Sequence, residues 1–205
     1  QRQMCIRDRT NHKKFGEDLA ILAGDALFLD PFGMIAASAL PDEVKVSLIL
    51  ELSDASGSRG MVAGQVLDME GEHKQLTLAE LQTIHANKTG RLLAYPFIAA
   101  GLILELQADI AQLLEKIGKK LGLAFQVRDD ILDLVADFEA LGKTPQKDLV
   151  AEKSTYPALL GLEESKALLT SELDACEDLL DQITAACNFD PRAIKNLIEG
   201  LRIDG

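Results

Sequence analysis

Apolar residues recur every three or four positions along most of the chain from Thr10 onward, and no segment shows the clean alternation of a β-strand. This spacing predicts amphipathic helices joined by mostly short connections. The expected helices cover residues 12–28, a short stretch from 30, 41–53, 60–70, 77–105, 107–136, 155–161, 163–186 and a last helix after 190. The predicted fold class is therefore all-α, a helical bundle.

Several helix starts carry their own local signal. Thr77 and Glu80 have the spacing of a capping box, in which each side chain accepts a hydrogen bond from the other residue's backbone amide. Asp30-Pro31 and Asp190-Pro191 each place a capping residue before a first-turn proline. Each of these pairs therefore predicts the beginning of a helix.

The length of the chain, 205 residues, fits one domain of ordinary size. Residues 1–9 are polar, basic and aperiodic, and we expect them to be a non-native or spurious stretch. Residues 10–205 are expected to form a single helical domain. The formal net charge of −12 argues against a nucleic-acid partner, because phosphate binding needs a basic surface.

Cysteine usage and hydropathy indicate a cytoplasmic protein without a membrane span. Cys176 and Cys187 lie on one predicted helix, about 16 Å apart along its axis, which is too far for a disulfide. Free cysteines fit a reducing compartment. The longest uncharged apolar stretch, Leu92–Leu104, is shorter than the ~20 residues that a membrane span needs.

The segment with the most chemical information is an acidic seam on the 107–136 helix. On a helical projection Gln126, Asp129, Asp130, Asp133 and Asp137 fall within a stripe about 100° wide, while most of the remaining surface is apolar. The plain interpretation is a solvated helix face. However, aspartate is a poor residue in the middle of a helix, and like charges four residues apart repel by roughly 0.2–0.5 kcal/mol per pair.

A divalent cation would remove that repulsion. Carboxylate oxygens on one face, with no histidine or cysteine beside them, suit Mg²⁺ better than zinc. Because Mg²⁺ held by few carboxylates usually completes its coordination with water and substrate phosphate, the seam predicts a phosphate or diphosphate ester as substrate.

A diphosphate also needs cationic partners, and Lys88 is the best candidate. It lies on the apolar stripe of its predicted helix, where its ammonium must either find an anion or reach out to solvent. Thr89 offers a hydroxyl beside it. On their own, Lys143 and Lys153, in the charged segment after the acidic helix, are ordinary solvated lysines.

The aspartate segment resembles a known family motif. Asp129-Asp130-Ile131-Leu132-Asp133, preceded by Phe125-Gln126 and followed by Leu141-Gly142-Lys143, resembles the second aspartate-rich motif of trans-prenyltransferases. These are the farnesyl and geranyl diphosphate synthases of the polyprenyl synthetase family. Four further segments resemble motifs of the family in the family's order, the last of them in its bacterial short-chain members: Asn11–Asp25, Gly60–Asp68, His85–Gly90 and Lys153–Pro157.

The resemblance implies roles for individual residues. Asp129 and Asp133 would hold Mg²⁺, and Asp130 would support them or accept a hydrogen bond. The resemblance also implies contacts to the allylic diphosphate from Lys88, Thr89, Gln126, Lys143 and Lys153, with Lys88, Asp129 and Asp130 as the catalytic set. Gln65 and Asp68 would either shape the floor of the cavity or be purely structural.

The resemblance implies Mg²⁺-dependent condensation of an allylic diphosphate with isopentenyl diphosphate. Mg²⁺ and the lysines would stabilise the departing diphosphate, and the double bond of isopentenyl diphosphate would attack the allylic cation. A proton would then be lost to the diphosphate. An apolar cavity suits the cation because it keeps water out. Members of the family are usually homodimers, so the intact parent is expected to be one.

This sequence also departs from the family. Members carry a first aspartate-rich motif with paired arginines just upstream of the segment that matches Asn11–Asp25, and an isopentenyl diphosphate site before that. Neither is present among the 205 residues. We therefore expect an incomplete isoprenoid (class I terpenoid) synthase fold that lacks the N-terminal helices, with residual diphosphate binding and weak or no turnover.

Two alternatives stay open. A non-catalytic subunit of a heteromeric prenyl diphosphate synthase would fit the missing first motif, although the retained second motif argues against it. A class I terpene cyclase or head-to-head synthase is disfavoured by the Lys-Thr and Gly-Lys elements.

Overall fold

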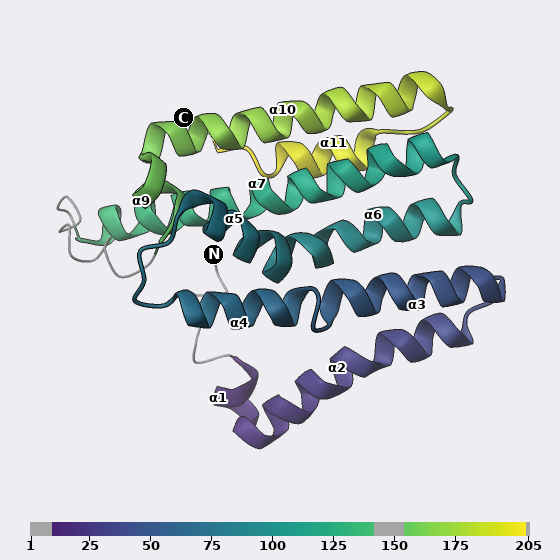
Figure 1. The fold of residues 1–205 in the computed structure, drawn as a ribbon, viewed down its shortest axis with the longest axis horizontal. Coiled ribbons are helices and arrows are strands. Elements are labelled where there is room, and N and C mark those ends of the chain that lie inside the picture. The colour runs from purple at the N-terminus through teal and green to yellow at the C-terminus, as the bar shows by residue number, and fades with distance from the viewer. Residues whose placement is uncertain (1–9, 142–153, 204–205) are drawn as a thin grey trace. The chain divides into compact units, whose positions relative to one another are not determined.

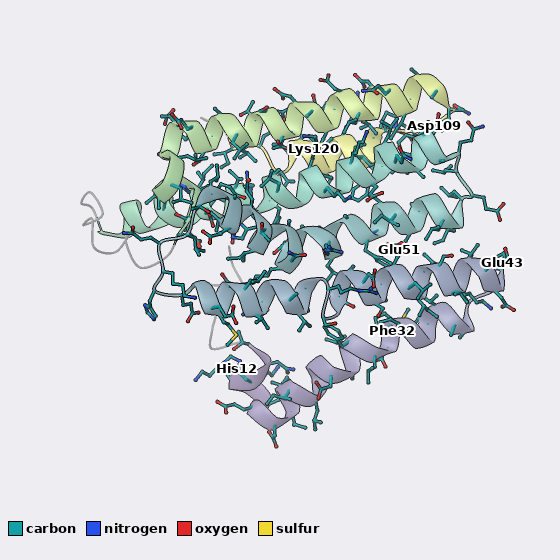
Figure 2. The ribbon with its side chains drawn as sticks, in the orientation of Figure 1. His12, Phe32, Glu43, Glu51, Asp109 and Lys120 are labelled. Atoms are coloured by element: carbon teal, nitrogen blue, oxygen red, sulfur yellow. The ribbon has the colours of Figure 1, made fainter. Side chains whose placement is uncertain are left out.

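The computed structural model describes residues 10–141 and 154–203, with side chains described up to 135 and again from 154 (Figure 1). Every regular element in these ranges is helical, which confirms the all-α prediction. The elements are α1 (Asn11–Phe15), α2 (Glu17–Ala37), α3 (Asp42–Ser56), α4 (Met61–Gly71), α5 (Leu78–His85), the π-helical segment η2 (Ala86–Gly90), α6 (Arg91–Ile103), α7 (Ala108–Leu141), α9 (Tyr156–Leu160), α10 (Leu162–Ala186) and α11 (Arg192–Glu199).

The chain divides into two compact units between Ile49 and Leu50, inside α3. In the first unit the predicted helix 12–28 is interrupted at Gly16, whose φ of 96° is a conformation that favours glycine. The predicted helix start at Asp30-Pro31 is wrong, because α2 continues through Pro31. Proline removes a single backbone donor and disturbs one turn, and the rest of α2 sustains the helix across that loss.

Helix α2 is long and apolar. Among the described residues it is the one helix that could cross a membrane by length and composition alone, with 21 residues and a mean hydropathy of 1.6 in its most apolar window. A single such helix near the N-terminus is weak evidence for a span. Asp25 and Asp30 lie within it, and charged side chains are costly inside a bilayer. The absence of a membrane span stays a prediction.

The core of the second unit is the interface between α7 and α10. Figure 1 shows α7 lying between α10 and α6, and it packs on both. The residues of α7 that face the core follow a three- and four-residue spacing: Ile110, Leu114, Ile117, Leu121, Ala124, Val127 and Ile131. The residues of α10 do the same: Leu169, Leu173, Cys176, Leu180 and Ile183. Interdigitating rows of this kind pack two long helices side by side and hold α7 rigid under the site.

The predicted helix 77–105 is three elements. Its start is as expected, because Thr77 and Glu80 form the capping box, with Glu80 Oε2 2.8 Å from the Thr77 amide. The α-helix ends at His85, and residues 86–90 form the π-helical segment η2 before α6 begins. Insertions of this type inside helices are frequent at functional sites. Lys88 and Thr89 both lie in η2.

Candidate functional site

The segment η2 lies between α4 and α7 at very short backbone distances. A Cβ added at Gly64 of α4 would lie 2.1 Å from the backbone nitrogen of Lys88. A Cβ added at Gly122 of α7 would lie 2.7 Å from the Cα of Gly90. Any larger side chain at Gly64 or Gly122 would push η2 away. These two glycines therefore fix the position of the turn that carries Lys88 and Thr89.

Lys88 forms an ion pair with Asp68 of α4. The distance from Lys88 Nζ to Asp68 Oδ2 is 2.5 Å, and both side chains are partly buried, with exposed fractions of 32% and 20%. The sequence predicts that the Lys88 ammonium must find an anion or reach solvent, and in the structure it finds this carboxylate. The segment Gly60–Asp68 and the segment His85–Gly90 are thus brought together at both Gly64 and Asp68.

The same face of α7 that contacts η2 carries the predicted metal ligands. At about 100° per residue, Gln126, Asp129 and Asp133 all point within about 40° of Gly122. Asp129 lies about 10 Å further along the helix axis than Gly122. The seam and the Lys88 turn therefore lie along one surface of α7.

The aspartates of this surface differ in their surroundings. Asp129 and Asp130 are partly buried, as are Gln126 and Thr89, whereas Asp133 is exposed. The mechanism that the resemblance implies favours an apolar cavity around the cation, whereas among the described residues Asp133 is open to solvent. Such a seam is accessible to a charged ligand. Lys143, Lys153 and the side chain of Asp137 lie outside the described residues.

Asp130 points to a different neighbour. Its Oδ2 accepts a hydrogen bond from the backbone amide of Tyr156 at 2.9 Å, so this carboxylate holds the first residue of α9 against α7. The Asp130 carboxylate therefore has a structural contact. Asp129 and Asp133 lie on the adjacent part of the surface of α7. The role that the resemblance implies for Asp130 stays a prediction.

The donor set fits Mg²⁺ in the form that such sites usually take. No three His, Cys, Asp or Glu side chains within the described part of the chain gather as a complete metal cage. Two carboxylates one helical turn apart, Asp129 and Asp133, supply hard oxygen ligands without a nitrogen or sulfur competitor. Mg²⁺ commonly binds one or two carboxylates together with water and phosphate oxygens. The pair therefore suits an ion that arrives with a phosphorylated ligand.

Three features of the site were not predicted from the sequence. The π-helical turn, the pairing of Lys88 with Asp68, and the packing of Tyr156 on His85 at 5.5 Å between ring centroids all depend on contacts distant in sequence or on backbone register. Among these features, the sequence gives a signal only for Asp68, because Asp68 ends the Gly60–Asp68 segment. The sequence does not decide whether Asp68 shapes the cavity floor or has a purely structural role.

Comparisons with known proteins show the family of the chain. The family model described as polyprenyl synthetase matches residues 7–187. Farnesyl diphosphate synthase of Micrococcus luteus is 53% identical over 171 residues, which cover 83% of this chain and 59% of that protein. Farnesyl diphosphate synthase of Geobacillus stearothermophilus is 46% identical over 171 residues, which cover 82% of this chain and 58% of that protein.

A solved structure shares the fold. The geranyltransferase of Helicobacter pylori complexed with magnesium and isoprenyl diphosphate matches with a TM-score of 0.72 and 34% identity, over 85% of this chain and 57% of that one. The chain thus spans less than two thirds of these relatives. The family match covers most of the 205 residues and includes every described residue of the site. The chain therefore belongs to the polyprenyl synthetase family.

Proposed function

We propose that this protein is a prenyltransferase of the farnesyl or geranyl diphosphate synthase type, which condenses an allylic diphosphate with isopentenyl diphosphate. The observation that carries the proposal is the single surface of α7 along which Gly122 seats the Lys88 turn and Asp129 and Asp133 follow. A cation and a pair of acidic metal ligands on one surface are what a diphosphate needs for binding.

Each residue has a defined task in this proposal. The Lys88 ammonium has three donors, of which one is directed to Asp68, so it can also donate to a diphosphate oxygen. The Thr89 hydroxyl, from η2, and the Gln126 amide, from α7, are proposed to orient the diphosphate. Lys143 and Lys153 are proposed as further diphosphate contacts from the segment that follows α7.

Asp129 and Asp133 would hold Mg²⁺, which supplies electrostatic stabilisation of the leaving diphosphate when it is bound. The allylic carbon–oxygen bond then breaks, and its electrons leave with the diphosphate. The double bond of isopentenyl diphosphate forms the new carbon–carbon bond, and a proton passes from that substrate to the diphosphate. The proposed reaction favours an apolar cavity around the cation, because such a cavity keeps water out.

Known proteins of similar sequence and structure support this assignment. The two relatives described above are named farnesyl diphosphate synthase, and the Helicobacter pylori structure holds magnesium and isoprenyl diphosphate. We propose Mg²⁺ as the cofactor, a homodimer for the complete enzyme, and the cytoplasm as its location. The buried free thiol of Cys176 is compatible with a reducing compartment.

The 205 residues contain one aspartate-rich motif of the family's two. We therefore propose that this chain alone binds diphosphate with Mg²⁺ but turns substrate over weakly or not at all. The second candidate, a non-catalytic subunit of a heteromeric synthase, is favoured by the same observation. It differs in that activity would appear only with a second, different chain.

Calorimetry on the chain tests the proposed site. Inorganic diphosphate is titrated with and without Mg²⁺ into the unchanged protein, Asp129→Asn, Asp133→Asn and Asp109→Asn. We expect Mg²⁺-dependent binding that is at least tenfold weaker in the first two variants. Asp109→Asn is the matched control, because Asp109 lies in the first turn of the same helix. An affinity for diphosphate that changes neither when Mg²⁺ is omitted nor in Asp129→Asn would contradict the proposed site.

A further inference from the structure

Tyr156 contacts a residue next to each of the two parts of the proposed site, on two different helices. Its backbone amide donates to Asp130 Oδ2 at 2.9 Å, next to Asp129 on α7. Its ring packs on the His85 ring, with 5.5 Å between centroids and 51° between planes. His85 is the last residue of α5 and lies three residues before Lys88. One residue therefore joins the aspartate turn to the beginning of the lysine turn.

The segment that delivers Tyr156 is itself fixed. Ser154 Oγ accepts a hydrogen bond from the Leu76 amide at 3.1 Å and donates to the Lys74 carbonyl at 3.4 Å. Thr155 then caps α9 by accepting a hydrogen bond from the Ala158 amide. Three consecutive residues are thus held by the loop before α5, by α9 and by α7. This arrangement leaves the Tyr156 ring little freedom to move away from His85.

The ring, rather than the hydroxyl, makes the contact. Tyr156 is fully buried and His85 is 8% exposed, so the ring pair is part of the core. The Tyr156 hydroxyl has no hydrogen-bond partner among the described residues. Burial, with Asp130 and Glu172 nearby, raises the pKa of this hydroxyl above its ordinary value, so it stays neutral. Removing the oxygen should leave the contacts with His85 and Asp130 intact.

We propose that Tyr156 is a positioning residue that holds the aspartate turn of α7 and the Lys88 turn in register with each other. The role rests on the proposed function as far as catalysis is concerned, but the mechanical coupling can be measured without any ligand. Loss of the ring removes the packing of Tyr156 on His85 and loosens α9, so both turns should open more often. Loss of the hydroxyl alone should open neither.

Hydrogen exchange tests the coupling. Amide exchange is followed in residues 86–90 and 129–133 of the unchanged chain, Tyr156→Phe, Tyr156→Leu and Ile183→Ala. Ile183 is the matched control, because it is 1% exposed in the same core but on the distant part of α10. We expect exchange of both turns to rise about tenfold in Tyr156→Leu, relative to the rest of the second unit, and to stay within about twofold in Tyr156→Phe.

Affinity for inorganic diphosphate with Mg²⁺ provides the second measurement. We expect about fivefold weaker binding in Tyr156→Leu and unchanged binding in Tyr156→Phe. Ile183→Ala should also bind normally, even if it loses as much thermal stability as Tyr156→Leu. Equal opening of the two turns in Tyr156→Leu and Ile183→Ala would overturn the proposal. If the unchanged chain binds no diphosphate, the proposed function fails, and the exchange result still decides whether Tyr156 positions the turns.

Discussion

Lys88 Nζ and Asp68 Oδ2 lie 2.5 Å apart, although the two residues are twenty positions apart in sequence and belong to η2 and α4. The pair fixes the Lys88 ammonium at a defined point between η2 and α4. Because the ammonium keeps donors to spare, Asp68 orients Lys88 without blocking it. The pair therefore prepares Lys88 for an anion before any ligand is present.

Replacement of Lys88 tests this arrangement. Lys88→Met keeps the length of the side chain and removes the charge, so we expect diphosphate to bind about tenfold more weakly, or about 1.4 kcal/mol. Calorimetry in the presence of Mg²⁺ measures the change. Lys166→Met is the control, since Lys166 pairs with Glu163 on α10 and has no place in the site. Equal affinity in the two variants would remove Lys88 from the site.

The close approach of η2 to its neighbours predicts the effect of small substitutions. Gly64→Ala and Gly122→Ala place a methyl group 2.1 Å from Lys88 N and 2.7 Å from Gly90 Cα, so each should destabilise the protein by about 1–3 kcal/mol. Gly101→Ala is the control, because its methyl group meets Ala111 Cβ at an ordinary 3.4 Å. Urea denaturation measures all three. A near-neutral Gly64→Ala would mean that η2 can move freely.

The capping box predicts a stability difference that depends on pH. Hydrogen bonds from the Thr77 amide and hydroxyl lower the pKa of Glu80 below its ordinary value of 4.5. A depressed pKa means that the ionised carboxylate stabilises the fold above about pH 4.5, and that this contribution is lost as the pH falls through the folded-state pKa.

Thermal denaturation of the unchanged protein and Glu80→Gln from pH 7 to pH 3 measures this effect. The unchanged protein should melt at the higher temperature at pH 7, and the gap should close in acid. A gap that widens below pH 4.5 would show the opposite sign of the pKa shift. Glu70→Gln, at the exposed end of α4, should show no such trend.

Cys176, inside α10, and Cys187, directly after α10, should differ in the reactivity of their thiols. Cys176 is buried, and burial raises the pKa of its thiol to about 12, whereas Cys187 is exposed. In a Cys5→Ser background, a colorimetric thiol reagent should modify one thiol promptly and the second only after denaturation. Cys187→Ser should abolish the prompt reaction. Prompt modification of both thiols would mean that the interface between α7 and α10 opens readily.

Local patterns were enough to predict most of the helices. The capping box at Thr77 and Glu80, the breaks before Met61 and after Ala186, and the helical phase that puts Asp129 and Asp133 on one face all depend on residues within one or two turns of each other. These relations follow from helix geometry alone. The grouping of Asp129, Asp133 and Lys88 as one diphosphate site stays a prediction.

Other features could not be predicted in this way. Continuation of α2 through Pro31 depends on the turns around the proline rather than on the proline itself. The partner of Lys88 is decided by the packing of α4 at Gly64, a contact between distant segments. Likewise, Tyr156 meets Asp130 and His85 only because α9 folds back on α7 and α5. Such contacts are set by the whole core and not by any one helix.

The π-helical turn at residues 86–90 has the character of a one-residue insertion into an ordinary helix. A π turn takes about one residue more than an α turn. The extra residue lengthens the chain without turning the flanking helices by the full angle of one helical residue. Deleting one residue from this stretch would therefore let α5 and α6 keep their present faces toward the bundle. The scaffold would survive the deletion, and the π turn that carries Lys88 would be lost.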